Sequence, residues 1–172
     1  MQHLKIDEKL GEGSFGVVYK GQYMLAPVAI KKIKKMSSRA RETYIADLTA
    51  LLSLRHRNIV SIVAHGYGIL VMPLVSTSLT GYLETASKTR PVGRALEYGE
   101  LKAITCNCCS ALLYMHHHVK SCVTHNDIKP DNTLLELSPS GEVVKAMLGD
   151  VGLSRMCSAN TGFTFIGTPG FM

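Results

Sequence analysis

The sequence predicts an α+β fold of two lobes, on three observations. Short β-branched or aromatic runs with glycine turns between them predict strands at residues 4–11, 17–22, 28–34, 59–66 and 69–74. One helical pattern, over residues 39–54, interrupts this β-rich region. After Leu79 the pattern becomes mainly helical. A β-rich first lobe over 1–71 and a mainly helical second lobe over 78–172 are therefore expected, with a connector at 72–77.

The helix predicted over residues 39–54 depends on spacing. Tyr44, Leu48 and Leu51 follow one another at intervals of four and three residues, which places them on one face of an α-helix. The first lobe is therefore expected to be a small sheet with one helix.

In the second lobe, residues 78–86 are predicted to form a short helix and the polar stretch 87–99 a loop. Residues 100–119 carry the clearest helical pattern of the chain. Its apolar face is predicted to consist of Leu101, Ile104, Cys108, Ala111, Leu112, Met115 and Val119. Strands at 133–137 and 143–148 follow, joined by a turn at 138–141.

The composition is that of a folded protein with a basic balance. Hydrophobic residues make up 46% of the 172 residues, which is enough for a core, and Lys+Arg exceed Asp+Glu by 19 − 13 = 6. Much of the excess lies in residues 31–35, followed by Arg39 and Arg41. A solvated strand end and helix start is the preferred interpretation over a nucleic-acid-binding module, so no nucleic-acid partner is expected.

The N-terminus and the apolar runs predict a location. Residues 1–10 are polar and charged, without the apolar centre of a signal peptide. The longest apolar run, residues 69–75, is far shorter than the ~20 residues that a membrane span needs. A soluble protein of the cytoplasm or nucleus is expected. The sequence sets no oligomeric state.

The five cysteines are an odd number and partly clustered, which is a poor disulfide framework. They are Cys106, Cys108, Cys109, Cys122 and Cys157. A zinc site from Cys106 and Cys109 with the histidines at 116–118 is an alternative, but small buried thiols on a helix are preferred.

Three segments together contain the groups that phosphoryl transfer needs. Residues 11–18 form a glycine-rich loop, residues 125–132 hold an acid, a lysine and a carboxamide, and residues 149–152 place a second acid between glycines. Because the β-branched Val17 and Val18 follow the third glycine, the loop fits a β-hairpin over phosphates better than a strand-to-helix turn. Taken alone, this loop could equally be a plain hairpin.

The order and spacing of these segments resemble the eukaryotic protein kinases, over essentially the whole chain. In that family the strand motif Val28-Ala29-Ile30-Lys31 supplies a lysine for the α- and β-phosphates. The resemblance implies a nucleotide site made of Leu10, Gly11, Gly13, Gly16, Val18, Ala29, Lys31 and Leu134. Since side chains alternate along a strand, only one of Lys31 and Lys32 can face this site; the motif selects Lys31 and leaves Lys32 as the alternative register.

The resemblance also assigns catalytic roles. Asp127 corresponds to the family's catalytic base and Lys129 to the residue that neutralises charge on the transferred phosphoryl group. Asn132 and Asp150 correspond to the Mg²⁺ ligands, and oxygen ligands suit magnesium. A lysine at 129 is typical of Ser/Thr kinases. The function implied is therefore Ser/Thr protein kinase, using ATP and Mg²⁺ on a protein substrate, in a style that resembles the tyrosine-kinase-like branch.

Three positions depart from the family pattern and favour an alternative, a pseudokinase that binds nucleotide without turnover. Asp47 stands where the family pairs a glutamate with the strand lysine. Asn126 stands where many kinases have an arginine that receives an activation-loop phosphate, which suggests regulation without that phosphate. Val151 replaces the usual phenylalanine.

Residues 167–172 resemble the substrate-docking loop of Ser/Thr kinases, with Thr168 expected near Asp127 and Lys129. The family continues with further helices beyond this loop. An incomplete second lobe, in a domain shortened within its activation segment by about 90 residues, is therefore expected.

Overall fold

The computed structural model of this chain describes residues 3–13, 16–34, 48, 52–90, 95–117, 123–150 and 155–156. The chain divides into two compact units, the first made of Met1–Ala46 and Ser61–Val75 and the second of Asp47–Val60 and Ser76–Met172. The later boundary falls inside the predicted connector 72–77. The mixed α+β class predicted from the sequence is confirmed.

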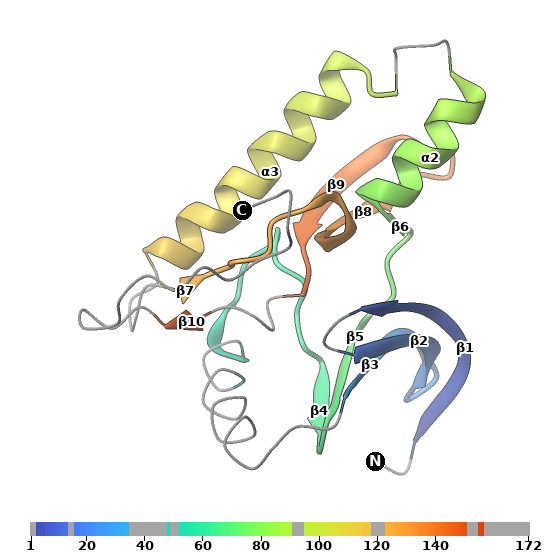
Figure 1. The fold of residues 1–172 in the computed structure, drawn as a ribbon, viewed down its shortest axis with the longest axis vertical. Coiled ribbons are helices and arrows are strands. Elements are labelled where there is room, and N and C mark those ends of the chain that lie inside the picture. Colours follow the sequence, from blue (N-terminus) through green and yellow to red (C-terminus); the bar gives the residue numbers. More distant parts are fainter. Residues whose placement is uncertain are drawn as a thin grey trace. The chain divides into compact units, whose positions relative to one another are not determined.

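The first unit is a five-stranded antiparallel sheet (Figure 1). Its strands are β1 (Leu4–Gly13), β2 (Gly16–Tyr23), β3 (Ala26–Ile33), β4 (Ala64–Gly66) and β5 (Ile69–Pro73), in the order β1-β2-β3-β5-β4. One face buries Val28, Ile30 and Val71, with Tyr19 and Ile69 packed against them. Since Val28 and Ile30 alternate along β3 with Ala29 and Lys31, the last two belong to the opposite face.

The strand predicted over residues 59–66 is wrong in extent, because only Ala64–Gly66 pairs in the sheet. Ile59 instead makes an isolated parallel bridge with Leu148, and the Val60 amide donates to the Leu148 carbonyl at 2.9 Å. The buried Asn58 side chain donates from Nδ2 to the Ala146 carbonyl at 2.8 Å. These bonds join residues 58–60, predicted in the first lobe, to β9 of the second unit.

The second unit contains the helices α2 (Leu79–Thr89) and α3 (Tyr98–His116), together with small sheets (Figure 1). One sheet has the order β6-β8-β9, from β6 (Thr77–Ser78), β8 (Thr133–Leu137) and β9 (Val143–Leu148); the other pairs β7 (Val123–Thr124) with β10 (Arg155–Met156). A 3₁₀ turn, η1 (Pro130–Asn132), precedes β8. The core contains Tyr82, Ile104, Leu135 and Ala146, so both helices pack on the β8–β9 ladder.

The bounds of α2 and α3 differ from the prediction. The Ser78 hydroxyl accepts from the Gly81 amide at 3.2 Å and starts α2, which continues beyond the predicted end at 86 to Thr89. The Glu100 carboxylate accepts from the Glu97 amide at 2.8 Å, in a capping box that starts α3 at Tyr98. The predicted loop 87–99 is therefore too long at both ends.

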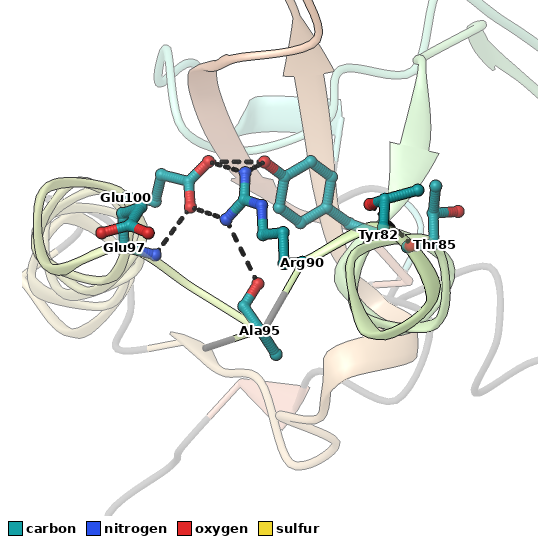
Figure 2. Close-up of polar contacts among 7 residues, drawn as sticks. Tyr82, Thr85, Arg90, Ala95, Glu97 and Glu100 are labelled. Atoms are coloured by element: carbon teal, nitrogen blue, oxygen red, sulfur yellow. Dashed lines mark hydrogen bonds and ion pairs between the residues drawn. The ribbon is translucent and has the colours of Figure 1, made fainter. Parts of the chain in front are cut away.

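A partly buried polar network joins α2 to α3 around Arg90 (Figure 2). The guanidinium donates to both Glu100 carboxylate oxygens, at 2.6 and 2.9 Å, and to the Tyr82 hydroxyl at 2.9 Å. The Tyr82 hydroxyl itself donates to Glu100. The Arg90 hydrogen bond holds the pKa of Glu100 at about 2, and burial raises the pKa of Tyr82. This arrangement is the bidentate geometry that makes an Arg–carboxylate pair strong.

The apolar face of α3 is narrower than the sequence predicts. Ile104, Ala111 and Met115 are buried, but Leu101 is 50% exposed, and Leu113, outside the predicted face, is 63% exposed. The prediction for Leu101 is therefore wrong, since Leu101 is not among the residues packed against the core cluster; Val119 is outside the described residues. Of the helices that the structure describes, none is long and apolar enough to cross a membrane.

The helix predicted over 39–54 lies largely outside the described residues. Within it, Leu48, Leu52 and Ser53 are helical, and Leu48 is buried.

Candidate active site

Five residues of the first unit form one row across the sheet. Gly11 pairs with Val18, Val18 with Lys31, Lys31 with Leu70, and Leu70 with His65. Directly paired residues of antiparallel strands share a face. The register therefore brings together Gly11, Val18 and Lys31, three of the predicted nucleotide-site residues, on the face opposite the Ile30 core.

The next row on the same face contains Ala29, paired with Lys20 on one side and Met72 on the other. Sequence reasoning missed Leu70 and Met72 as members of this face. The alternation of β5 could have identified them, but only once its register with β3 was known. Leu10 lies at an irregularity in the β1–β2 pairing, between Lys9 and Gly11, and its side chain is half exposed.

Lys31 and Lys32 lie in different environments. The Lys31 side chain is buried, with 7% of its surface exposed. Lys32 is exposed, and its ammonium lies 5.1 Å from the centre of the Tyr19 ring. The burial and the shared row with Val18 favour Lys31 over Lys32 as the lysine of the site.

The glycines of the loop differ in the space that surrounds them. A Cβ on Gly16 would meet the Lys32 carbonyl oxygen at 2.3 Å, so the approach of β3 requires this glycine. A Cβ on Gly11 or Gly13 would meet nothing within 4 Å in the described part of the chain. Packing among these residues therefore does not explain Gly11 and Gly13, whereas backbone access for an anionic ligand would.

Glu12, between those two glycines, is held by two cations. Its carboxylate lies 2.7 Å from the Lys9 ammonium and 3.1 Å from that of Lys34. The Lys9 hydrogen bond, followed by that of Lys34, lowers the pKa of Glu12. The paired lysines offset a negative charge that would otherwise oppose phosphate binding at this loop.

The predicted base and metal ligand of the second unit contact each other directly. Asp127 is 4% exposed, and the Asn132 Nδ2 donates both to its carboxylate Oδ2 and to its backbone carbonyl, each at 2.8 Å. The Lys129 ammonium lies 3.1 Å from the same Oδ2. The 3₁₀ turn at Pro130–Asn132 brings the Asn132 side chain back toward Asp127. Three of the predicted residues therefore form one cluster.

His125 and Gly149 are linked to this cluster by hydrogen bonds. The His125 Nε2 donates to the Gly149 carbonyl at 2.9 Å, and its Nδ1 accepts from the Asp127 amide at 3.3 Å. Burial lowers the pKa of His125, which favours the neutral ring that these two bonds require. The Gly149 amide donates to the Asn132 carbonyl at 2.8 Å, which ties the residue before Asp150 to the same loop.

Gly149 also contacts Leu134, and sequence reasoning missed its positioning role. A Cβ on Gly149 would lie 2.8 Å from the Leu134 Cδ1, so glycine leaves the space that this predicted nucleotide-site side chain occupies. Leu134 is half-buried, between the buried Thr133 and Leu135 on β8. The motif Gly-Asp-Val-Gly drew attention to Asp150, and only the packing identifies the role of the preceding glycine.

The donor groups of the second unit fit magnesium better than zinc. With its Nδ2 engaged by Asp127, Asn132 can offer only its amide oxygen to a metal, and Asp150 offers carboxylate oxygens. Neither is a thiolate or imidazole. Among the residues described, no group of three or more His, Cys, Asp or Glu side chains is placed to hold a metal ion.

The cysteines that the structure describes are free. Cys106 and Cys109 are exposed, while Cys108 is half-buried and packs against the core of the second unit. Burial raises the pKa of the Cys108 thiol, which keeps it protonated and weakly reactive. The exposure of Cys106 and Cys109 contradicts the prediction of small buried thiols at these positions. Cys122 and Cys157 lie outside the described residues.

The predicted residues thus form two groups, one on the sheet of the first unit and one in the loops of the second, and each group is described within its own unit. Asp47, Val151, Thr168 and the loop 167–172 lie outside the described residues.

Comparison with known proteins agrees with this geometry. The chain matches the protein kinase domain family over residues 4–172. It is 31% identical to a probable L-type lectin-domain containing receptor kinase S.5 of Arabidopsis thaliana, over 96% of this chain and 26% of that protein. It is 34% identical to the L-type lectin-domain containing receptor kinase IX.1 of the same plant, over 91% of the chain and 23% of the relative.

A third relative comes from rice. The L-type lectin-domain containing receptor kinase SIT1 of Oryza sativa subsp. japonica is 33% identical over 90% of this chain and 23% of its own length. The chain thus spans about a quarter of the length of these relatives. It belongs to the protein kinase family, and it covers part of a kinase domain.

Proposed function

We propose that this chain binds ATP with Mg²⁺ and transfers the γ-phosphoryl group to Ser or Thr hydroxyls of a protein substrate. The observation that carries the proposal is the cluster in which Asn132 and Lys129 both contact the Asp127 carboxylate. Phosphoryl transfer depends mainly on positioning and charge neutralisation, and this cluster combines an oriented acid with a cation.

Asp127 has the role of base in this proposal. Its Oδ2 accepts a hydrogen bond from Asn132, which restrains the carboxylate that would accept the proton of the substrate hydroxyl. Lys129, 3.1 Å from the same oxygen, supplies a positive charge for the phosphoryl oxygens. A lysine two residues after the base is also the feature that favours Ser/Thr over Tyr as acceptor.

Asn132 and Asp150 would hold Mg²⁺ through oxygen atoms, and bound magnesium supplies charge neutralisation on the phosphates. On the nucleotide side, Lys31 would pair with the α- and β-phosphates. Val18 and Ala29, on the same sheet face, would contact the adenine, and the resemblance to kinases adds Leu134 to the nucleotide-binding residues. Gly11 and Gly13 leave their backbone amides accessible to phosphate oxygens.

The test uses the full-length protein as its transcript encodes it. Incorporation of labelled phosphate is measured on mixed peptides with Ser, Thr or Tyr as the acceptor, for wild type, Asp127→Asn and Asp150→Asn. Each substitution is expected to lower kcat by about 10²-fold or more, with Ser and Thr preferred over Tyr. Turnover that survives both substitutions would exclude this site as the catalytic centre.

Nucleotide binding without turnover in the folded full-length protein would favour the pseudokinase alternative, to which Asp47, Asn126 and Val151 point by sequence. For the location, we propose the cytoplasm, with the nucleus as the alternative, because a kinase needs the ATP and Mg²⁺ that these compartments supply.

A further inference from the structure

The turn between β2 and β3 has a backbone conformation that its two residues rarely adopt. Tyr23 pairs with Ala26, so the turn contains only Met24 and Leu25, whose φ angles are +49° and +68°. A two-residue hairpin turn with two positive φ angles is of type I′, and its usual residues are Asn-Gly, Asp-Gly or Gly-Gly. Methionine and leucine adopt positive φ at a cost that glycine avoids and asparagine reduces. The turn therefore holds two residues that its backbone disfavours.

Both side chains of this turn are exposed. Met24 is 64% exposed and Leu25 is 94% exposed. Ala26 and Pro27, which follow them, are exposed as well, so four successive apolar residues lie at the tip of the hairpin. Neither Met24 nor Leu25 is among the side chains packed against the described core of the first unit. Backbone preference and packing within this unit therefore do not explain why the turn carries Met and Leu.

The charge around the tip favours an anionic partner. The first unit contains nine Lys or Arg against four Asp or Glu, so it carries +5 of the formal net charge of +6. Residues 1–6, 13–34 and 61–75 contain no Asp or Glu. Lys5 pairs with Gln22 at the end of the β1–β2 ladder nearest the turn, and its side chain is exposed. An anionic surface that approaches this end of the hairpin is attracted and meets no acidic side chain.

The small size of the tip favours a membrane over a protein. A stable protein interface buries about 800 Å² on each partner, which is far more than a turn of two side chains supplies. A bilayer can take up single apolar side chains, each of which contributes in proportion to the apolar surface that leaves water. Anionic headgroups also attract a neighbouring lysine. An apolar turn beside a lysine therefore fits a lipid surface better than a second copy of this chain.

We propose that the Met24–Leu25 turn, together with Lys5, is a contact site for membranes that contain anionic phospholipids. The two apolar side chains enter the headgroup region, and the Lys5 ammonium pairs with anionic headgroup oxygens. The contact is weak and reversible, because it consists of two side chains and one cation. It goes beyond the proposed kinase activity and does not depend on it, since none of these residues belongs to the candidate nucleotide or catalytic groups.

The experiment measures sedimentation of the full-length protein with two kinds of vesicle, phosphatidylcholine alone and equal parts of phosphatidylcholine and phosphatidylserine. The double variant Met24→Asn, Leu25→Gly installs the residues that a type I′ turn prefers. Its affinity for the phosphatidylserine vesicles should fall at least about tenfold. Its Tm should rise by about 2–5 °C, because the left-handed cost is relieved. The opposite directions separate a lost membrane contact from a damaged fold.

Three further variants serve as controls. Met24→Leu keeps an apolar side chain and should bind the phosphatidylserine vesicles within about twofold of wild type. Lys5→Gln should lower the affinity for these vesicles about fivefold, with no effect on phosphatidylcholine alone. Val144→Thr is the matched control, because Val144 is as exposed as Met24, at 63%, but lies on β9 of the second unit. It should leave vesicle binding unchanged.

Four results would overturn the proposal. A wild type that binds neither kind of vesicle would leave a protein as the partner of the tip. A double variant that binds as tightly as wild type would exclude the turn from the contact. Equal binding of wild type to both kinds of vesicle would remove the anionic lipid from the proposal. A double variant with a lower Tm would show that Met24 and Leu25 stabilise the fold and are present for that reason.

Discussion

Asn132 donates a hydrogen bond from Nδ2 to the Oδ2 of Asp127 at 2.8 Å, and both side chains are buried. The residue proposed to bind the metal therefore also orients the proposed base. A side-chain amide can have both roles because its nitrogen donates hydrogen bonds and its oxygen can bind a metal ion. This double use predicts that a carboxylate, which would keep a metal ligand at 132, is not a conservative replacement.

Asn132→Asp is expected to lower kcat by about 10²-fold at pH 7.5, because two buried carboxylates would face each other. Lowering the pH should recover part of the activity relative to wild type, as one of the two carboxyls retains a proton. The measurement is the kcat ratio of variant to wild type between pH 8 and pH 5.5. A ratio near one throughout would mean that the donated hydrogen bond has no catalytic importance.

Lys31 and Lys32 can be distinguished by nucleotide-dependent stabilisation. With Mg·ATP at about a hundredfold excess over Kd, the Tm of the wild type should rise by about 5–10 °C. Lys31→Met should lose most of this rise, because the buried lysine lies on the face proposed to bind the nucleotide, while Lys32→Met serves as the matched control and should keep it. The reverse result would establish the alternative register.

Because the His125 ring is buried, the free energy of unfolding is expected to fall in mild acid. Its pKa is lowered by burial, so the folded state stays neutral while the unfolded chain takes up a proton below about pH 6.5. As the pH falls from there toward the folded pKa, stability is lost by up to about 1.4 kcal/mol per pH unit. Urea unfolding of the full-length protein between pH 7.5 and 5 measures this slope.

Two variants test whether His125 causes this pH dependence of stability. His125→Gln should be less stable at pH 7.5 but should show a shallower dependence on pH. His65→Gln, at an exposed position, should keep the wild-type slope. If His125→Gln and wild type show parallel profiles, protonation of this ring is not the cause.

The Arg90–Glu100 pair predicts a loss of stability in Glu100→Gln. The pKa of Glu100, about 2, lies below its usual value, so its contribution is complete above about pH 4.3 and disappears as the pH falls toward 2. Allowing for solvent screening, the loss at pH 7 should be about 1 kcal/mol, or a Tm lower by about 2–4 °C. The difference should shrink at pH 3.

Glu136→Gln is the control for this prediction, since the Glu136–Lys145 pair has a comparable distance of 2.8 Å but a half-exposed carboxylate. It should change Tm by less than 1 °C, as exposed ion pairs usually contribute little. Equal effects of the two substitutions would show that the network in Figure 2 has no special stabilising role.

Residues 1–172 expressed alone are expected to associate. Leu101 and Leu113 on α3 are at least half exposed, and the chain covers only part of a kinase domain. Light scattering should show oligomers, and Leu101→Lys with Leu113→Lys should reduce them. A monomer with one sharp unfolding transition would contradict the expectation.

The grouping of three candidate residues was predictable from the sequence, because they are close together in the chain. Asp127, Lys129 and Asn132 lie within six positions of one another, so one loop can gather them without help from distant segments. The alternation along β3 likewise predicted that Lys31 and Lys32 point to opposite faces. The α+β class followed from the change of period at Leu79.

Predictions from local sequence periodicity were wrong where contacts with distant segments determined the structure. The strand at 59–66 was too long because Ile59 and Val60 pair with Leu148, almost ninety positions away. Leu101 fits the apolar face of α3 by spacing, but its exposure depends on what packs against the helix. The start of α3 depends on the reciprocal bonds of Glu97 and Glu100, in a stretch whose polarity predicted a loop.

The sequence by itself thus determined the family, the fold class and the candidate residues, because these depend on residue types in a fixed order. Only the tertiary structure decided that Lys31 is buried and Lys32 exposed, that Gly149 leaves room for Leu134, and that Asn126 turns the backbone between two buried neighbours. The physical reason is that burial, close approach and backbone reversal are set by contacts between segments far apart in the chain, and no local pattern records them.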